Sequence, residues 1–163
     1  MSTTSKDPIV FDRTYDAPLE DVWELWTTKD GFESWWGPEG FRVQVHELNP
    51  TVGGILFYDM IACGTEQIAH MKAANMPLSH ETRGTFTEVE PLKRLVLRHV
   101  IDFIPGLEPY ENFMRVEFSQ SPQGTRMLLS VDPNATEDWT KAATEGMASQ
   151  LTKAPAALAA RRK

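Results

Sequence analysis

The stretch from Ile9 to Trp26, IVFDRTYDAPLEDVWELW, decides the fold, because its hydrophobic period changes from two residues to that of a helix. Residues 9–15 alternate between apolar and polar side chains, as a half-buried strand does. Pro18 then suits the first turn of a helix, where its missing N–H is not needed. Apolar residues recur behind it at helical spacing: Leu19, Val22, Trp23 and Trp26. We therefore predict a strand that leads directly into an amphipathic helix.

Further strand-like segments follow this unit along most of the chain. A short second helix is expected over 32–36, ended by Gly37-Pro38. The later strands are separated by turns of hairpin length, which favours antiparallel pairing. They are predicted at 41–48, 54–61, 83–89, 94–102, 112–119 and 125–131.

Two segments depart from this pattern of strands. Residues 62–81 form an insertion in which a short helix is expected from 66 to about 74. A long Ala-rich helix is predicted from about 136 to 153, and Pro155 should end or kink it. Its apolar stripe consists of Trp139, Ala142, Ala143, Met147 and Leu151. The chain ends, 1–7 and 156–163, are expected to be flexible.

These elements predict a single α+β domain over residues 1–163. In it, a curved antiparallel sheet of about six or seven strands wraps around the long C-terminal helix. A sheet rarely closes completely against a helix, and the remaining space is often a pocket. We expect the insertion at 62–81 to act as a lid or wall over the mouth of that pocket.

Composition and charge exclude several classes of partner. The chain has 163 residues and a net charge of −7, which disfavours binding to nucleic acid or to anionic membranes. Cys63 is the single cysteine, so no intrachain disulfide forms and a reducing compartment is expected. The polar first residues do not resemble a signal peptide, and no apolar run approaches the ~20 residues of a membrane span. We expect a cytoplasmic protein with no cofactor.

Several motifs resemble one known family, in the order in which that family carries them. The first is YDAPLEDVW at residues 15–23, followed by WWGP at 35–38 and GGILF at 53–57. GTFTEVEP at 84–91, RLV at 94–96 and GTRML at 124–128 agree with them. Over roughly residues 9–152 the chain resembles the activator-of-heat-shock-protein-ATPase-homologue family. This family belongs to the START and birch-pollen-allergen-like (SRPBCC) superfamily.

The resemblance implies a helix-grip fold and, with it, a scaffold for small molecules. The superfamily includes lipid carriers, hormone receptors and cyclases, so it implies no single reaction. The chain departs from the family pattern at two places. The insertion at 62–81 replaces a short hairpin, and Gly146 is followed by Met147 where relatives often have Gly-Trp.

Phenylalanine and methionine side chains favour an apolar cavity for a lipid-like or aromatic ligand. The candidate ligand-binding residues are Trp36, Phe57, Asp59, His70, His80, Phe86, His99, Phe113, Trp139 and Met147. Each has a plainer interpretation: a tryptophan that packs its helix onto the sheet, a core methionine or phenylalanine, or a surface histidine. Trp35 is more readily explained by packing than Trp36.

One strand poses a choice between two polar neighbours. Alternation along 94–102 places Arg98 and His99 on opposite faces, so one of them points toward the helix. Such a residue is a natural anchor for a ligand carboxylate or hydroxyl, and it can equally be satisfied by a core partner.

The sequence gives little support for a metal site or for nucleophilic catalysis. The insertion gathers five residues of ligand type: Cys63, Glu66, His70, His80 and Glu81. Their spacing matches no tight zinc motif, so we predict no metal. The chain also lacks a G-x-S-x-G nucleophile motif.

Three functions remain open. The first is a binding protein for a small apolar molecule. The second is a cyclase- or hydrolase-type enzyme on the same scaffold, with proton transfer by His80, His99, Glu81 or Asp59. The third is a chaperone-cofactor or stress-response interaction module, which requires an exposed apolar patch. A homodimer is possible and would produce the same patch.

Overall fold

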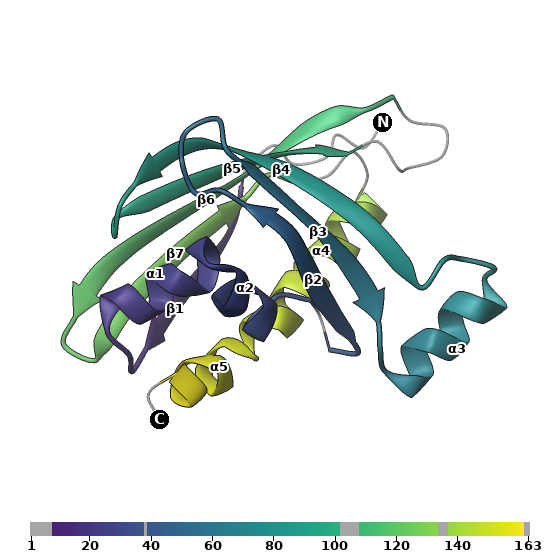
Figure 1. The fold of residues 1–163 in the computed structure, drawn as a ribbon, viewed down its shortest axis with the longest axis horizontal. Coiled ribbons are helices and arrows are strands. Elements are labelled where there is room, and N and C mark those ends of the chain that lie inside the picture. The colour runs from purple at the N-terminus through teal and green to yellow at the C-terminus, as the bar shows by residue number, and fades with distance from the viewer. Residues whose placement is uncertain (1–7, 38, 102–107, 134–136, 162–163) are drawn as a thin grey trace.

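The computed structural model describes residues 8–37, 39–101, 108–133 and 137–161. In this part of the chain it has seven strands and five helices (Figure 1). The strands are β1 (Ile9–Tyr15), β2 (Phe41–Leu48), β3 (Ile55–Ala62), β4 (Ser79–Glu90), β5 (Arg94–Ile101), β6 (Tyr110–Ser121) and β7 (Gly124–Val131). The helices are α1 (Leu19–Thr27), α2 (Lys29–Trp35), α3 (Thr65–Ala73), α4 (Glu137–Leu151) and α5 (Ala154–Arg161).

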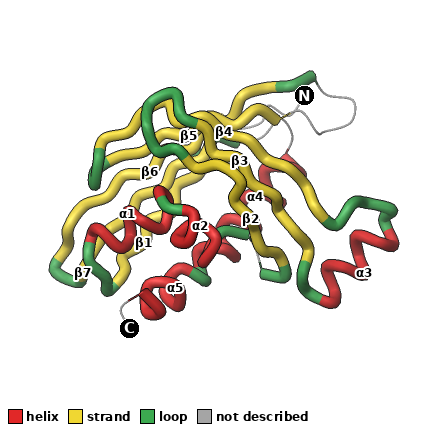
Figure 2. The backbone as a smooth tube through the Cα atoms, viewed as in Figure 1, coloured by secondary structure: helices red, strands yellow, loops and turns green. Residues whose placement is uncertain are grey.

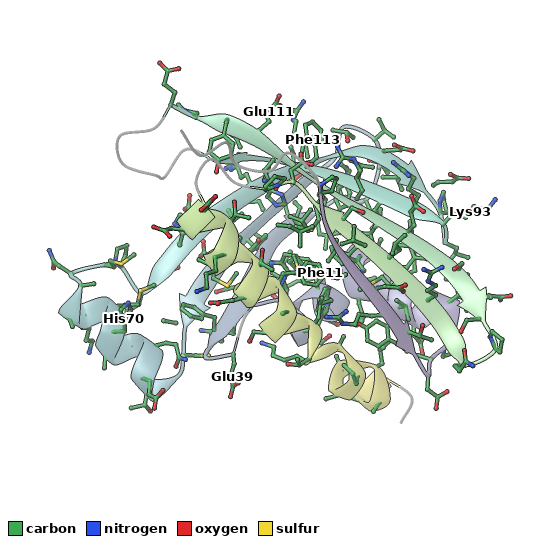
Figure 3. All side chains as sticks on the ribbon, turned by 180° about the vertical axis from the view of Figure 1, so that it is seen from behind. Phe11, Glu39, His70, Lys93, Glu111 and Phe113 are labelled. Carbon is green, nitrogen blue, oxygen red and sulfur yellow. The ribbon has the colours of Figure 1, made fainter. Side chains whose placement is uncertain are left out.

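All seven strands form one curved antiparallel sheet, in the order β1-β7-β6-β5-β4-β3-β2. Seen from behind, α4 crosses in front of the concave face of this sheet (Figure 3). This is the predicted α+β, helix-grip architecture. The predicted strand 41–48 has the bounds that the structure gives to β2.

Alternation along the strands separates two faces. The concave face carries buried side chains from neighbouring strands, among them Tyr58, Phe86, Leu97 and Leu129. The convex face carries the charged residues between them and their ion pairs, such as Arg126 with Asp12 at 2.7 Å. A residue's strand parity therefore decides whether it faces α4 or the opposite side.

Tryptophans from α1 and α2 build one end of the core. The rings of Trp26, Trp35 and Trp36 meet edge to face at centroid distances of 5.1–5.4 Å. The Trp35 Nε1 donates a hydrogen bond to the Leu25 carbonyl, and the Trp36 Nε1 donates to the Tyr58 hydroxyl. Trp35 therefore packs as predicted, and Trp36, a candidate ligand-binding residue, occupies the packing position that was its alternative interpretation.

The last turns of α4 are fastened to the loop that precedes β2. The Gln150 side chain accepts a hydrogen bond from the Gly37 N–H at 2.8 Å, and the Ser149 hydroxyl accepts one from the Glu39 N–H at 2.9 Å. Met147 and Leu151 are buried, as the predicted stripe requires.

The first half of α4 differs from that stripe. Ala142 and Ala143 are exposed, because the helix packs against its neighbours only toward its C-terminal end. The side chain of Trp139 lies outside the described residues.

The segment after α4 also differs from expectation. Residues 156–161 were expected to be flexible, but they belong to α5, in which Ala157 and Leu158 are buried. Figure 2 shows α5 beside α1 and α2. Pro155 lies in the first turn of this helix, where proline is tolerated, so it marks a helix start as well as a break. Residues 1–7 and 162–163 lie outside the described part of the chain. No described helix combines the length and apolar character needed to cross a membrane.

Candidate functional site

Strands β4 and β5 separate at one end of their pairing. Gly84 opposite His99 is the last pair between them. Beyond it, residues 79–83 of β4 pair only with β3, while Val100 and Ile101 of β5 pair with β6. Figure 1 shows that β4 starts on the side of α3, whereas β6 starts in another part of the molecule. The sheet therefore has a fork, with Gly84 and His99 at its apex.

A pocket of about 470 Å³ lies at this fork. Its walls are residues 80–85 of β4, residues 98–100 of β5 and Ile55 of β3. By register, His80, Thr82 and Gly84 belong to the concave face, whereas the residues between them belong to the convex face. The fork pocket is thus bordered by both faces of the sheet, and its volume falls in the range of small-molecule sites.

His99 is the buried polar group in this wall. It is 7% exposed, and its ring lies against the Gly84 backbone. No hydrogen bond of the His99 imidazole is found among the described residues. Burial lowers the pKa of His99 to about 4, so the ring is neutral near pH 7. A neutral imidazole has one N–H donor and one nitrogen acceptor.

The wall on the β6 side of His99 is held by its own hydrogen bonds. Asn112, directly opposite His99, donates from Nδ2 to the Asp132 carbonyl at 2.9 Å. The Asp132 carboxylate accepts hydrogen bonds from the Phe113 N–H and from Arg115 Nη1, both at 3.0 Å. These bonds tie β6 to the end of β7, which fixes the strand behind His99.

The outer rim of the pocket is charged. Arg83 places its guanidinium 4.2 Å from the centroid of the Phe57 ring. The Nε atom of Arg98 lies 3.1 Å from a carboxylate oxygen of Glu111. Glu81 adds one carboxylate to the same wall.

The structure brings two of the predicted ligand-binding residues into this pocket, His80 and His99. The choice between Arg98 and His99 is also settled, because His99 shares the concave face with Leu97 and Phe86 through the register. Phe86 is fully buried two residues from Gly84, so it packs beneath the pocket wall.

Three predicted residues lie on the other face of the sheet. Phe57, Asp59 and Phe113 are outward by alternation and are not brought together with His99. The Oδ2 atom of Asp59 lies 2.9 Å from His46 Nε2, and its Oδ1 atom is buried with no hydrogen-bond partner among the residues that the structure describes. These residues were misplaced because side chains alternate between the two faces of a strand. Assigning a strand from sequence does not say which of the two alternating sets faces the helix.

The remaining candidates are elsewhere. Trp36 and Met147 are buried core residues; Met147 accepts a hydrogen bond from Gln150 at its sulfur. His70 is exposed on α3, away from Glu111 and Phe113 (Figure 3). Helix α3 has no buried side chain, and residues 62–78 do not line the fork pocket. The insertion is therefore not a lid over this pocket, although His80 and Glu81 at its end belong to the wall.

Sequence patterns alone do not single out Thr82, Gly84 or Arg83 as site residues. Gly84 carries a weak signal, because a glycine inside a strand often marks a close approach. The separation of β4 from β5 has no sequence signal, because it depends on where pairing between distant segments stops. Among residues 8–37, 39–101, 108–133 and 137–161, no group of three or more His, Cys, Asp or Glu side chains is arranged to hold a metal ion.

Comparison with known families gives one match over most of the chain. Residues 16–159 match the family described as activator of Hsp90 ATPase homolog 1-like protein. No curated protein matches the sequence.

Solved structures share the fold at low sequence identity. A Chromobacterium violaceum protein has a TM-score of 0.75 at 21% identity, covering 93% of this chain and 96% of its own. A Nitrosomonas europaea protein has a TM-score of 0.74 at 17% identity, with 98% and 99% covered. The AHSA1 protein of Silicibacter pomeroyi has a TM-score of 0.73 at 21% identity, with 94% and 99% covered. At these identities the likeness establishes the fold alone.

Proposed function

We propose that this chain, which belongs to the activator of Hsp90 ATPase homolog 1-like protein family, binds a small, largely apolar molecule in the fork pocket. The observation that carries the proposal is His99, a buried imidazole in the pocket wall without a hydrogen bond among the described residues. The His99 ring lines the pocket with its Nε2 atom beside Gly84, so a ligand bound there can form a hydrogen bond with it.

The protonation state of His99 narrows the ligand. Because burial lowers its pKa to about 4, the imidazole meets the ligand uncharged at neutral pH. An uncharged imidazole can accept a hydrogen bond from a ligand hydroxyl, or it can donate one to a ligand carbonyl. Ile55 and Val100 supply apolar wall. A bicyclic aromatic alcohol or ketone suits both features.

Two fluorescent probes test this function: 2-naphthol and naphthalene, which differ by the hydroxyl. We expect 2-naphthol to bind about tenfold more tightly, the effect of one hydrogen bond to the His99 ring. His99→Phe keeps a ring of similar size and should abolish the preference. His70→Phe, on exposed α3, is the matched control and should preserve it. Failure of both probes to bind, or an equal preference in the His99→Phe variant, would contradict the proposal.

A second candidate is an enzyme that transfers protons in the same pocket. It is favoured by three residues that can transfer protons, His80, Glu81 and His99, around one pocket. Hydrolysis of 2-naphthyl acetate above the buffer rate would support this candidate if both His80→Gln and His99→Phe reduced it. An unchanged rate in both variants would leave only binding.

A further inference from the structure

The outer rim of the fork pocket presents two guanidinium groups on one face of the sheet. Arg98 lies directly opposite Thr85 in the register, and Arg83 is two residues from Thr85 along β4. Both arginines are therefore convex-face residues, whereas His99 belongs to the concave face. The pocket thus has a neutral imidazole at its inner side and cations at its outer side.

The cation of Arg83 has no ion-pair partner among the described residues. The guanidinium lies over the face of the Phe57 ring, which leaves its edge available to an acceptor. Arg98 is paired with Glu111, but that contact is exposed: the two side chains are 40% and 55% accessible. A pair this exposed exchanges readily with another carboxylate.

Resting on the function proposed above, we propose that the ligand of the fork pocket is an acid. It carries a hydroxyl or carbonyl for His99 at one end of its apolar body and a carboxylate or sulfonate for Arg83 and Arg98 at the other. Guanidinium groups bind such anions through paired N–H donors. Glu81 and Glu111 stand beside the same arginines and oppose a second negative charge, so the expected ligand is a monoacid.

Three probes, of which the acid and its ester have nearly equal shape, separate the contribution of the acid group from that of the rest of the ligand. They are 6-hydroxy-2-naphthoic acid, its neutral methyl ester and 2-naphthol. We expect the acid to bind about fivefold more tightly than the ester at low salt, the size expected for a half-exposed ion pair. The difference should shrink as the salt concentration rises.

Variants assign the effect to the rim. Arg83→Gln and Arg98→Gln should each reduce binding of the acid and leave the ester unchanged. Arg42→Gln is the control, because Arg42 is an exposed convex-face arginine that does not line the pocket. Glu111→Gln should have the opposite sign and strengthen binding of the acid. Glu117→Gln, which removes one of the two carboxylate partners of Arg94, should change the binding of neither the acid nor the ester.

The outcomes distinguish this inference from the proposed function. Tight, His99-dependent binding of 2-naphthol with no gain for the acid would overturn the inference and leave the function standing. Equal losses in Arg83→Gln, Arg98→Gln and Arg42→Gln would overturn it as well, since they would indicate a general charge effect. Absence of binding by all three probes would overturn both. Melting temperatures of each variant establish that the protein is folded.

Discussion

The His99 imidazole lies so close to Gly84 that a β-carbon added at position 84 would be 2.9 Å from its Nε2 atom. The two residues face each other as the last pair between β4 and β5. Position 84 therefore needs a residue without a side chain, and it needs one because of His99 rather than because of backbone strain.

Gly84→Ala should consequently destabilise the protein, by about 1–3 kcal/mol as is usual for overpacking a core. In a His99→Ala background the ring is gone, and the same substitution should cost much less. Urea denaturation of the wild type, the two single variants and the double variant measures this coupling. Additive losses would mean that the two residues do not meet.

Acidification should weaken the fold through His99. Its pKa is lowered from 6.5 to about 4 by burial, so between these values the unfolded chain binds a proton that the native state does not. Stability therefore falls as the pH is lowered through this window, by up to about 1.4 kcal/mol per pH unit from this group.

His99→Phe cannot titrate and should show a shallower decline between pH 6.5 and 4 than the wild type. Chemical denaturation at several pH values provides the comparison. His46, His70 and His80 are present in both proteins, so their contributions cancel. Identical slopes would show that His99 does not remain neutral in the native state.

Helix α3 should be dispensable for binding. It has no buried side chain, and the Ala62 N–H already bonds to the Leu78 carbonyl across its base. Replacing residues 63–77 by Asn-Gly should close the β3–β4 hairpin with a two-residue turn. The replacement removes the backbone bonds from Cys63 and Gly64 to the Gly40 carbonyl, so stability should fall by about 1–2 kcal/mol.

The affinity for 2-naphthol should stay within about twofold of the wild type in this deletion variant, because α3 does not contribute to the pocket wall. Fluorescence titration measures it. A large loss of affinity in a folded protein would restore the lid role that the sequence predicted for this insertion.

Two buried tyrosines should respond differently to loss of the hydroxyl. The Tyr15 hydroxyl is buried and has no hydrogen-bond partner in the described part of the chain, whereas the Tyr58 hydroxyl accepts a bond from Trp36 Nε1 at 3.0 Å. Tyr15→Phe should be neutral or stabilising, because it removes an unsatisfied polar group. Tyr58→Phe should cost about 1 kcal/mol or more, because it leaves the indole N–H unpaired. Thermal unfolding measures the stability of both variants. A larger loss of stability in Tyr15→Phe than in Tyr58→Phe would contradict this prediction.

Much of this fold could be predicted because its signals are local. Alternation predicted β2, and helical spacing behind Pro18 predicted α1. The C-terminal helix pair was harder, because Pro155 predicts an interruption without saying that a second helix begins there. The buried faces of Ala157 and Leu158 depend on docking against distant helices.

The candidate site was less predictable than the fold. His99 was named because it is a polar residue in an apolar strand. Phe57, Asp59 and Phe113 were named with it as ligand-binding residues, but the register puts them on the other face of the sheet. The fork depends on pairing between segments that are distant in sequence. Beyond Gly84 and His99, β4 pairs only with β3, and β5 pairs with β6. No short window of sequence carries that information.

The central claim is that a ligand hydroxyl or carbonyl pairs with His99. A long-range ¹H–¹⁵N correlation spectrum of the imidazole nitrogens, recorded while 2-naphthol is added, tests it most directly. We predict that the His99 nitrogen resonances move in a saturable way, with the same dissociation constant as the probe fluorescence, while those of His46 and His70 stay in place. Saturable binding of 2-naphthol with unmoved His99 resonances would contradict the account.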